Sequence, residues 1–121
     1  MAIVSLQLIV IKTNKLPELV KFYSALGLVF DHHRHGNGPL HFSAAAGATV
    51  LELYPLPKGI ASPDATTRLG FTVQDLDGVL RRLKEMNTSV VTEPVVTEWG
   101  CSGVVLDPDG RKIELTQSGI A

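Results

Sequence analysis

The sequence predicts an α+β fold built from two copies of one module, in which a strand and a helix precede a run of strands. Two observations support this prediction. The apolar residues of two amphipathic segments repeat with an offset of 60 residues, and two glutamates in similar apolar runs, Glu52 in Val-Leu-Glu-Leu and Glu114 in Lys-Ile-Glu-Leu, lie 62 residues apart. A carboxylate at the same place in both copies predicts two half-sites that face one cavity.

The first module is expected to open with a buried strand over residues 5–11. In the next segment apolar residues recur every three or four positions, which predicts one apolar helix face. These residues are Leu16, Leu19, Val20, Tyr23 and Leu26. Asn14 is the expected N-cap and Gly27 the expected end of the helix, because each residue type suits the backbone required there. Strands are expected over 40–44 and 49–54.

The second module repeats this order, beginning with a strand over residues 69–73. The apolar positions of its helix are Leu76, Val79, Leu80, Leu83 and Met86. Asp75 is the expected N-cap, and Asn87 tolerates the left-handed conformation at which a helix ends. Later strands are expected over 103–106 and 111–116.

The whole chain, residues 1–121, is expected to form a single domain. Module one is placed at 3–57 and module two at 67–117. Between them, residues 58–66 are rich in Pro, Gly and Ser, a composition typical of a linker.

Composition excludes several classes of function. The 11 basic and 12 acidic residues are spread along the chain without a basic stripe, so nucleic acid is not an expected partner. The apolar run over 3–11 is too short to span a membrane, and no membrane partner is expected. The single Cys101 rules out a disulfide within the chain and favours a reducing, cytoplasmic location.

Several motifs together make the sequence resemble the vicinal oxygen chelate superfamily over about residues 3–117. They are Leu16 to Tyr23 followed by Leu26-Gly27-Leu28, Trp99-Gly100, Asp107 to Gly110, and Ile113-Glu114-Leu115. This superfamily includes glyoxalase I, bleomycin-resistance proteins and extradiol dioxygenases. The resemblance implies two βαβββ modules related by a pseudo-twofold axis, which form an open, incomplete barrel around a cavity. It also implies a small-molecule ligand or substrate and a homodimer, with the cavity lying within one chain or across the pair.

Many proteins of this superfamily hold a divalent metal such as zinc, nickel or manganese in the cavity. Carried over to this chain, the resemblance gives Gln7, Glu52 and Glu114 as possible metal ligands and places Arg68 at the fourth ligand position. Arginine has no acceptor atom and stays charged. At 4 Å it would repel a positive charge by about 4 kcal/mol with an effective dielectric constant near 20. If module one has one more residue than module two between its first strand and its helix, Gln7 takes the first-strand ligand position. If it has none, Leu8 takes that position.

Other side chains are candidates for the same cavity. His41 begins a strand and is a candidate general base or hydrogen-bond donor, because imidazole titrates near neutral pH. Trp99 and Tyr54 either form an apolar wall for a flat ligand or belong to the core. His33 and His35 could share one strand face and suggest a metal pair. With His32 they lie among polar residues and glycines, however, a pattern that favours a solvated hairpin tip.

Three functions follow from these residues. The first is a glyoxalase/bleomycin-resistance-like protein with a small-molecule cavity and without the full metal site, in which Arg68, Trp99, Tyr54 and Gln7 contact the ligand. The alternative is a metal-dependent glyoxalase-I-like lyase or isomerase that uses Gln7, Glu52 and Glu114. The third is a metal-free enzyme in which Glu52, Glu114 or His41 acts as the base and Arg68 stabilises an oxyanion.

Overall fold

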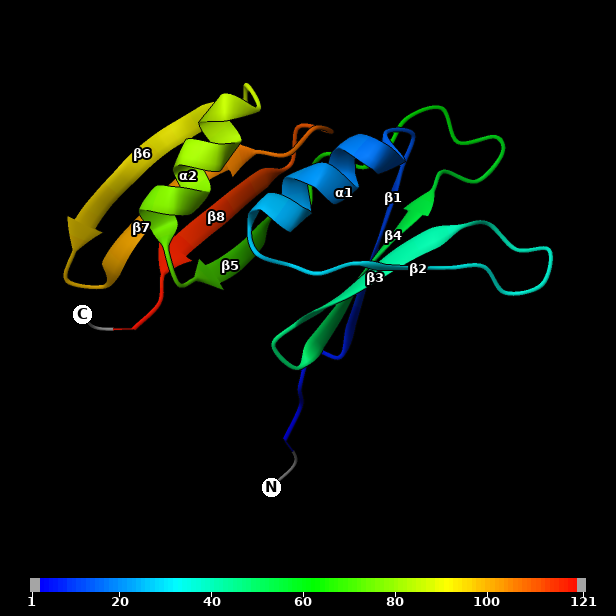
Figure 1. Ribbon diagram of the computed structural model, residues 1–121, viewed down its shortest axis with the longest axis horizontal. Helices are drawn as coiled ribbons and strands as arrows, with labels where there is room; N and C mark the ends of the chain where they lie inside the picture. The colour runs from blue at the N-terminus through cyan, green and yellow to red at the C-terminus, as the bar shows by residue number, and fades with distance from the viewer. Residues whose placement is uncertain (1–2, 120–121) are drawn as a thin grey trace.

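The computed structural model describes residues 3–119 and divides them into two similar modules (Figure 1). The first module contains β1 (Leu8–Thr13), α1 (Leu16–Ala25), β2 (Asp31–His33), β3 (His41–Ala46) and β4 (Thr49–Pro55). The second contains β5 (Leu69–Val73), α2 (Leu76–Glu85), β6 (Val90–Thr97), β7 (Gly100–Leu106) and β8 (Lys112–Gln117). In this part of the chain no helix is both long and apolar enough to cross a membrane.

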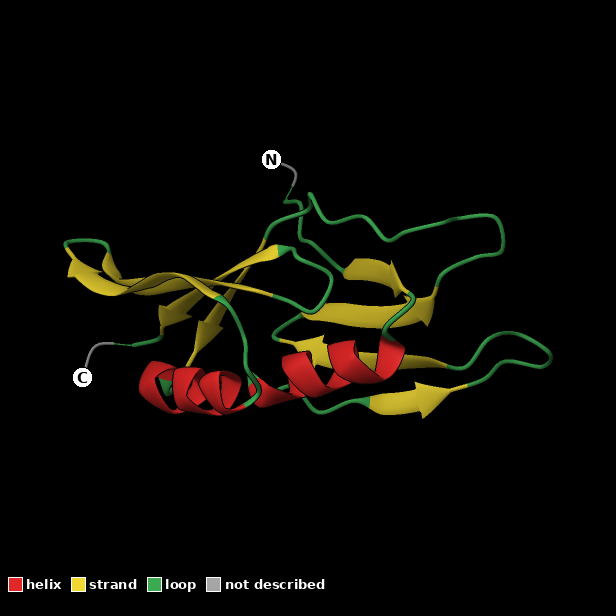
Figure 2. Ribbon diagram, turned by 90° about the horizontal axis from the view of Figure 1, so that it is seen from above, coloured by secondary structure: helices red, strands yellow, loops and turns green. Residues whose placement is uncertain are grey.

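Each module forms its own four-stranded mixed sheet. The strand order is β1-β4-β3-β2 in the first sheet, called sheet A, and β5-β8-β7-β6 in the second, called sheet B. The first and last strands of each module pair in parallel, and the remaining neighbours pair antiparallel. The predicted α+β fold of two repeated βαβββ modules is therefore confirmed. The two sheets do not close into one barrel, and both helices lie along the same side of the molecule (Figure 2).

One hydrophobic core joins the two modules. Helix α1 buries Leu19, Phe22 and Tyr23, while α2 buries Leu76, Val79, Leu80 and Leu83. The strands contribute Ile11, Leu51, Leu53, Val73, Val105, Ile113 and Leu115 to the same cluster. Each helix therefore covers one face of its sheet and leaves the other face, called the open face, without a helix.

The two helices begin differently. At α2 the predicted N-cap is confirmed, because the Asp75 carboxylate accepts a hydrogen bond of 3.1 Å from the Gly78 N–H. At α1 the prediction of Asn14 was wrong, because the cap position is Lys15, which makes no side-chain cap bond. The Thr13 hydroxyl instead accepts the Lys15 N–H at 2.9 Å and closes the turn before the helix. A buried threonine thus replaces the asparagine in shaping this turn.

Both predicted helix ends are confirmed by the backbone. Gly27 has φ = 116° and Asn87 has φ = 62°, values in the left-handed region that glycine and asparagine tolerate best. The first strand differs from its predicted range of 5–11, since β1 starts at Leu8 and continues to Thr13. The shift matters for the site, because the register of this strand decides which side chains reach the open face.

A buried ionic network connects α1 of the first module to the β7–β8 turn of the second. The Tyr23 hydroxyl donates to Asp107 at 2.7 Å. The Arg111 guanidinium donates to Asp107 at 3.0 Å and to Asp109 at 2.9 Å. All three charged side chains are at most 2% exposed. Two carboxylates thus share one guanidinium, and within the described residues the second oxygen of Asp109 has no hydrogen-bond partner.

This burial changes the pKa values of the network. Burial raises the pKa of Tyr23 well above its usual value, and the adjacent Asp107 carboxylate raises it further. Burial alone would lower the pKa of Arg111, but its hydrogen bonds and charge interactions with Asp107 and Asp109 raise it overall. The phenol therefore stays neutral and the guanidinium charged, which keeps the network intact at neutral pH.

Candidate functional site

The open face of sheet A collects most of the polar groups that could contact a ligand. Along β4, Leu51 and Leu53 are buried beneath the helices. Because side chains alternate along a strand, Glu52 and Tyr54 point to the opposite, open face. Glu52 is only half-buried on the open face, so its carboxylate keeps access to solvent although it lies in the middle of a strand.

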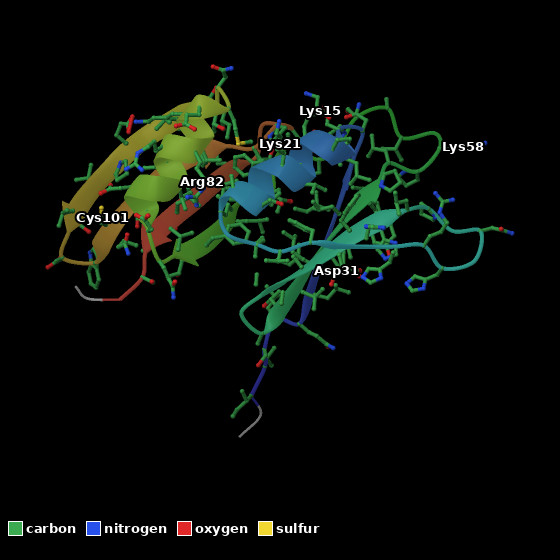
Figure 3. All side chains as sticks on the ribbon, in the orientation of Figure 1. Lys15, Lys21, Asp31, Lys58, Arg82 and Cys101 are labelled. Atoms are coloured by element: carbon green, nitrogen blue, oxygen red, sulfur yellow. The ribbon has the colours of Figure 1, made fainter. Side chains whose placement is uncertain are left out.

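Strand pairing aligns Glu52 with other polar residues in one row across this face. Glu52 is paired with Ser43 on β3, and Ser43 is paired with Asp31 on β2. On its other side Glu52 is paired with Val10 of β1. Directly paired side chains share a face of the sheet and lie about 4.5–5.5 Å apart at Cβ. The row therefore carries two carboxylates separated by a hydroxyl, and Asp31, which Figure 3 labels, belongs to the edge strand β2.

A second row, made of rings, runs beside the first. His41 stacks on Tyr54 with ring centroids 4.2 Å apart and planes at 6°. His33 is paired with His41 across the β2–β3 ladder, and their rings lie 5.7 Å apart. The ring of His35 is 5.3 Å from that of His41. His41 is only 3% exposed, because its aromatic neighbours cover it.

The open face of sheet B carries the second glutamate. Ile113 and Leu115 are buried under α2, so alternation turns Glu114 outward. Glu114 is paired with Gly70 of β5, where an added Cβ would lie 3.6 Å from the Glu114 Oε2 atom. The carboxylate therefore leans across β5, over the space that a side chain would fill.

A hydroxyl pair extends this face beside Glu114. Ser102 and Thr116 are directly paired, and their hydroxyl oxygens are 2.8 Å apart. Sheet B thus offers one carboxylate and two hydroxyls, and its open face has fewer rings than that of sheet A.

The register of the first strands determines which residues accompany the glutamates. Val10 is paired with Glu52 and Gly70 with Glu114, so the two copies are offset by 60 residues at this point. Leu8 is consequently the equivalent of Arg68. Alternation puts Gln7 on the side of sheet A opposite to Glu52. Of the two registers that the sequence allowed, the strand pairing selects the one that brings Leu8 to the open face.

Few donor atoms lie at the four positions that the sequence assigned to a possible metal. Glu52 and Glu114 have oxygen donors, but Leu8 has none and Arg68 adds a fixed positive charge. Within residues 3–119 no three His, Cys, Asp or Glu side chains are grouped as a metal site. The donor set is therefore poorer than the sequence suggested, because the strand register removes Gln7.

The remaining predicted residues are placed apart from these rows. Trp99 is 87% exposed in the β6–β7 turn, so it is not a core residue. Arg68 is exposed directly before β5. Within one chain the structure thus brings together Glu52, His41 and Tyr54 on sheet A, while Glu114 lies on the separate sheet B.

Sequence reasoning missed Asp31 and Ser43 and assigned His33 to a hairpin tip. The short strand β2 lies in the segment assigned to a hairpin tip, and only the turn at residues 36–38 fits that description. Asp31 and His33 are two residues apart, the spacing that places side chains on one face of a strand. That spacing was the available signal, but the surrounding glycines and charged residues concealed a strand of three residues.

Two grooves lie elsewhere on the molecule. One, of about 690 Å³, lies between sheet A and β5, and its lining includes Ile9, Leu51 and Phe71. The other, of about 730 Å³, lies between the helices and the β7–β8 turn, with Glu18, Lys21 and Glu85 at its border. Neither groove is lined by Glu52, Glu114, His41 or Tyr54. The candidate site is therefore an open surface on each sheet within one chain.

Comparison with known proteins identifies the family to which the chain belongs. The model of the Glyoxalase/Bleomycin resistance protein/Dioxygenase superfamily matches residues 5–115. Sequence comparison with curated proteins finds no significant match.

Solved structures with this fold cover nearly the whole chain. TnmS3, an antibiotic binding protein from Streptomyces sp. CB03234, is 26% identical with a TM-score of 0.71, and the match covers 98% of this chain and 99% of TnmS3. Virulence protein STM3117 from Salmonella typhimurium is 21% identical with a TM-score of 0.71 over 98% and 100% of the two chains. TioX from Micromonospora sp. ML1 is 16% identical with a TM-score of 0.71 over 93% and 98%.

Proposed function

We propose that this chain, which belongs to the Glyoxalase/Bleomycin resistance protein/Dioxygenase superfamily, is a small-molecule-binding protein that works without the metal of its metal-dependent relatives. One observation carries the proposal. Strand pairing aligns a row of carboxylates with a row of rings on the open face of sheet A. The first row supplies charge and hydrogen bonds, and the second supplies the ring faces of Tyr54, His33 and His35, which surround His41.

The two rows favour a flat, aromatic ligand that carries a basic group. Rings offer a large contact area to a planar molecule at small conformational cost. Glu52 and Asp31 would attract an amine at its edge, with Ser43 between them as a hydrogen-bonding partner. The similarity to TnmS3, an antibiotic binding protein, supports the same ligand class.

The proposal includes a homodimer. Each chain presents its two half-sites on separate sheets, so Glu114 of one copy would complete a cavity opened by Glu52 of another. The open faces also expose apolar side chains that a partner would cover, namely Leu8, Val10, Val50 and Val95, with exposures of 37–57%. A cytoplasmic location is proposed from the single Cys101.

Catalysis is not part of the proposal. His41 is stacked against Tyr54 and is 3% exposed, so it supports the ring of Tyr54 and is poorly placed to reach a substrate proton itself.

The test is a thermal-shift screen with glycopeptide and aromatic polyketide antibiotics, followed by calorimetry on every compound that stabilises the protein. A ligand at 100 times its Kd should add about 2.7 kcal/mol to the free energy of unfolding. Tyr54→Ala should weaken binding about tenfold or more, because a stacking ring and its buried area contribute at least about 1.4 kcal/mol.

Tyr54→Phe is the matched control, since it keeps the ring and should bind within about threefold of wild type. The proposal fails if no compound stabilises the protein. It fails equally if Tyr54→Ala binds as tightly as Tyr54→Phe.

A further inference from the structure

Three histidine rings lie together at the end of sheet A where the β2–β3 hairpin turns. The ring centroids are 5.3 Å apart for His35 and His41, 5.7 Å for His33 and His41, and 6.2 Å for His33 and His35. Each ring therefore lies beside both of the others. Because imidazole nitrogen is a common ligand of zinc, copper and nickel, a triangle of three imidazoles is a candidate metal site.

The strand pattern explains why these three rings share one face of the sheet. His33 and His35 are two residues apart, and His33 is directly paired with His41 across the β2–β3 ladder. Residues two apart in an extended chain, like directly paired residues, point to the same side. The neighbouring His32 is paired with Phe42, and its ring is 6.0 Å from that of Phe42, so it lies on the opposite face.

A tight turn brings His35 to this face. The Gly38 N–H donates to the His35 carbonyl at 2.9 Å. Gly36 has φ = 59°, and a Cβ on Gly38 would lie 3.0 Å from the His35 carbonyl oxygen, so the turn favours glycine at both positions. The glycines that make the sequence resemble a solvated tip therefore also hold a histidine beside the strands.

His41 is held in an orientation that suits a metal ligand. Its Nδ1 lies 3.3 Å from the Pro39 carbonyl oxygen, which can only accept, so in the neutral ring Nδ1 carries the proton and Nε2 keeps its lone pair. Stacking on Tyr54, with ring centroids 4.2 Å apart, fixes the plane of the ring. Metal-binding histidines usually donate their second N–H to a carbonyl or carboxylate in this way.

The spacing of the rings is close to that of a three-histidine zinc site. A Zn–N bond of about 2.0–2.1 Å puts two ring centroids about 5.2 Å apart in tetrahedral geometry, and the observed separations exceed this value by at most about 1 Å. In their present rotamers the described side chains form no group of three metal donors. His33 and His35 are exposed, however, so their rings can turn toward His41 without displacing a buried neighbour.

We propose that His33, His35 and His41 bind one divalent first-row metal ion, for which zinc is the probe, at the turn of the β2–β3 hairpin. His41 is the fixed ligand, and His33 and His35 close over the ion. None of them lies at the four positions that the sequence assigned to a metal, so this site is separate from that of the metal-dependent relatives. Three protein ligands leave the fourth position of a tetrahedral ion open to water or to another small donor. The inference rests neither on the proposed antibiotic ligand nor on the homodimer.

The first experiment is a calorimetric titration of the untagged, metal-free chain with zinc chloride. One zinc per chain is expected, and excess magnesium should not displace it, because magnesium prefers oxygen ligands. His33→Ala and His35→Ala should each raise the zinc Kd at least about tenfold, since each removes one of three ligands. His32→Ala is the matched control, because it removes an imidazole from the same strand but from the opposite face, and its Kd should stay within about twofold of wild type.

A further variant tests the buried ligand. His41→Phe keeps a ring against Tyr54 but has no nitrogen, so it should also raise the zinc Kd at least about tenfold. Circular dichroism checks that this variant is folded. If it does not fold, the ring nitrogens of the wild type decide.

The second experiment therefore records the nuclear magnetic resonance signals of the imidazole nitrogens in wild type, with and without zinc. Zinc should shift one ring nitrogen in each of His33, His35 and His41, and none in His32. In His41 the shifted nitrogen should be Nε2, because Nδ1 donates to the Pro39 carbonyl.

The proposed site is wrong if wild type binds no zinc, or if His32→Ala weakens binding as much as His33→Ala does. It is equally wrong if folded His41→Phe binds zinc as tightly as wild type, or if Nε2 of His41 does not shift, since the exposed histidines would then bind zinc on their own. None of these results bears on antibiotic binding, which the Tyr54 variants test. Any zinc site introduced elsewhere on the chain is measured in the His33→Ala variant, in which this one is weakened.

Discussion

Replacing Arg111 by methionine removes the only guanidinium from the buried network between the two modules. Methionine keeps much of the side-chain volume and the apolar stem. It leaves Asp107 and Asp109 without the two donated hydrogen bonds of 3.0 and 2.9 Å. Their side chains are 0% and 1% exposed, so water does not replace the lost donors without opening the turn.

The expected loss in the free energy of unfolding is large for one residue. Removing one partner of a buried ion pair costs about 3–5 kcal/mol, because the remaining charge is buried and uncompensated. Here two carboxylates lose the same partner, and one oxygen of Asp109 already lacks a hydrogen bond. A small domain is stable by about 5–15 kcal/mol in total, so Arg111→Met should bring the chain close to unfolding.

Urea denaturation followed by far-ultraviolet circular dichroism measures this loss; fluorescence is less suitable because Trp99 is already exposed in the folded state. Arg81→Met is the matched control, since Arg81 is exposed on α2 and should change stability by at most about 0.5 kcal/mol. Adding Asp109→Asn to Arg111→Met should restore about 1–2 kcal/mol of the free energy of unfolding, because it removes one buried charge that has lost its partner. A loss no larger than that of Arg81→Met would refute the reasoning.

Two further changes test the network and the strand register. Tyr23→Phe should cost about 1.5–3 kcal/mol at neutral pH, because Asp107 loses a donor. Burial, and then the Asp107 carboxylate, raises the pKa of Tyr23 above its ordinary 10.0, so the unfolded chain releases this proton first. Wild-type stability should therefore fall by about 1.4 kcal/mol per pH unit above pH 10, a loss that the phenylalanine variant lacks in urea titrations; equal slopes would contradict it. In the proposed dimer, where the open faces of sheets A and B of two copies meet, Leu8→His combined with Arg68→His should bind zinc at least tenfold more tightly than either single variant in calorimetry. Zinc binding by the double variant that is lost when Gln7 is also replaced would show that the register is wrong.

The elements that could be predicted from sequence were those in which apolar residues recur at regular spacing over a long segment. Both helices repeat at three and four residues and carry local stop signals at Gly27 and Asn87, so chemistry close in sequence determined them. Asn14 failed as a cap because the helix begins one residue later than predicted, with Lys15 at the cap position. A choice between two adjacent polar residues depends on backbone angles that one sequence does not reveal.

The residues of the candidate site could be predicted less completely, because their positions depend on how the strands pair. Glu52 was found because a repeat marks it, and Tyr54 and His41 because they lie on strands that could be recognised. The side of the sheet reached by Gln7 depended on a one-residue register, which only the pairing with β4 establishes. Asp31 and Ser43 became part of the site through cross-strand pairing, Asp31 with Ser43 and Ser43 with Glu52, and the register of such pairs is not given by the sequence alone.

The hydrogen bond from Tyr23 to Asp107 reaches from one copy of the repeat to the other, and the apolar cluster beneath it draws on both. Neither half could be expressed alone and keep its shape, since each would expose an ionic or aromatic surface that the other now covers. We therefore expect the chain to melt in a single transition. The two repeated modules of this protein therefore form one thermodynamic unit.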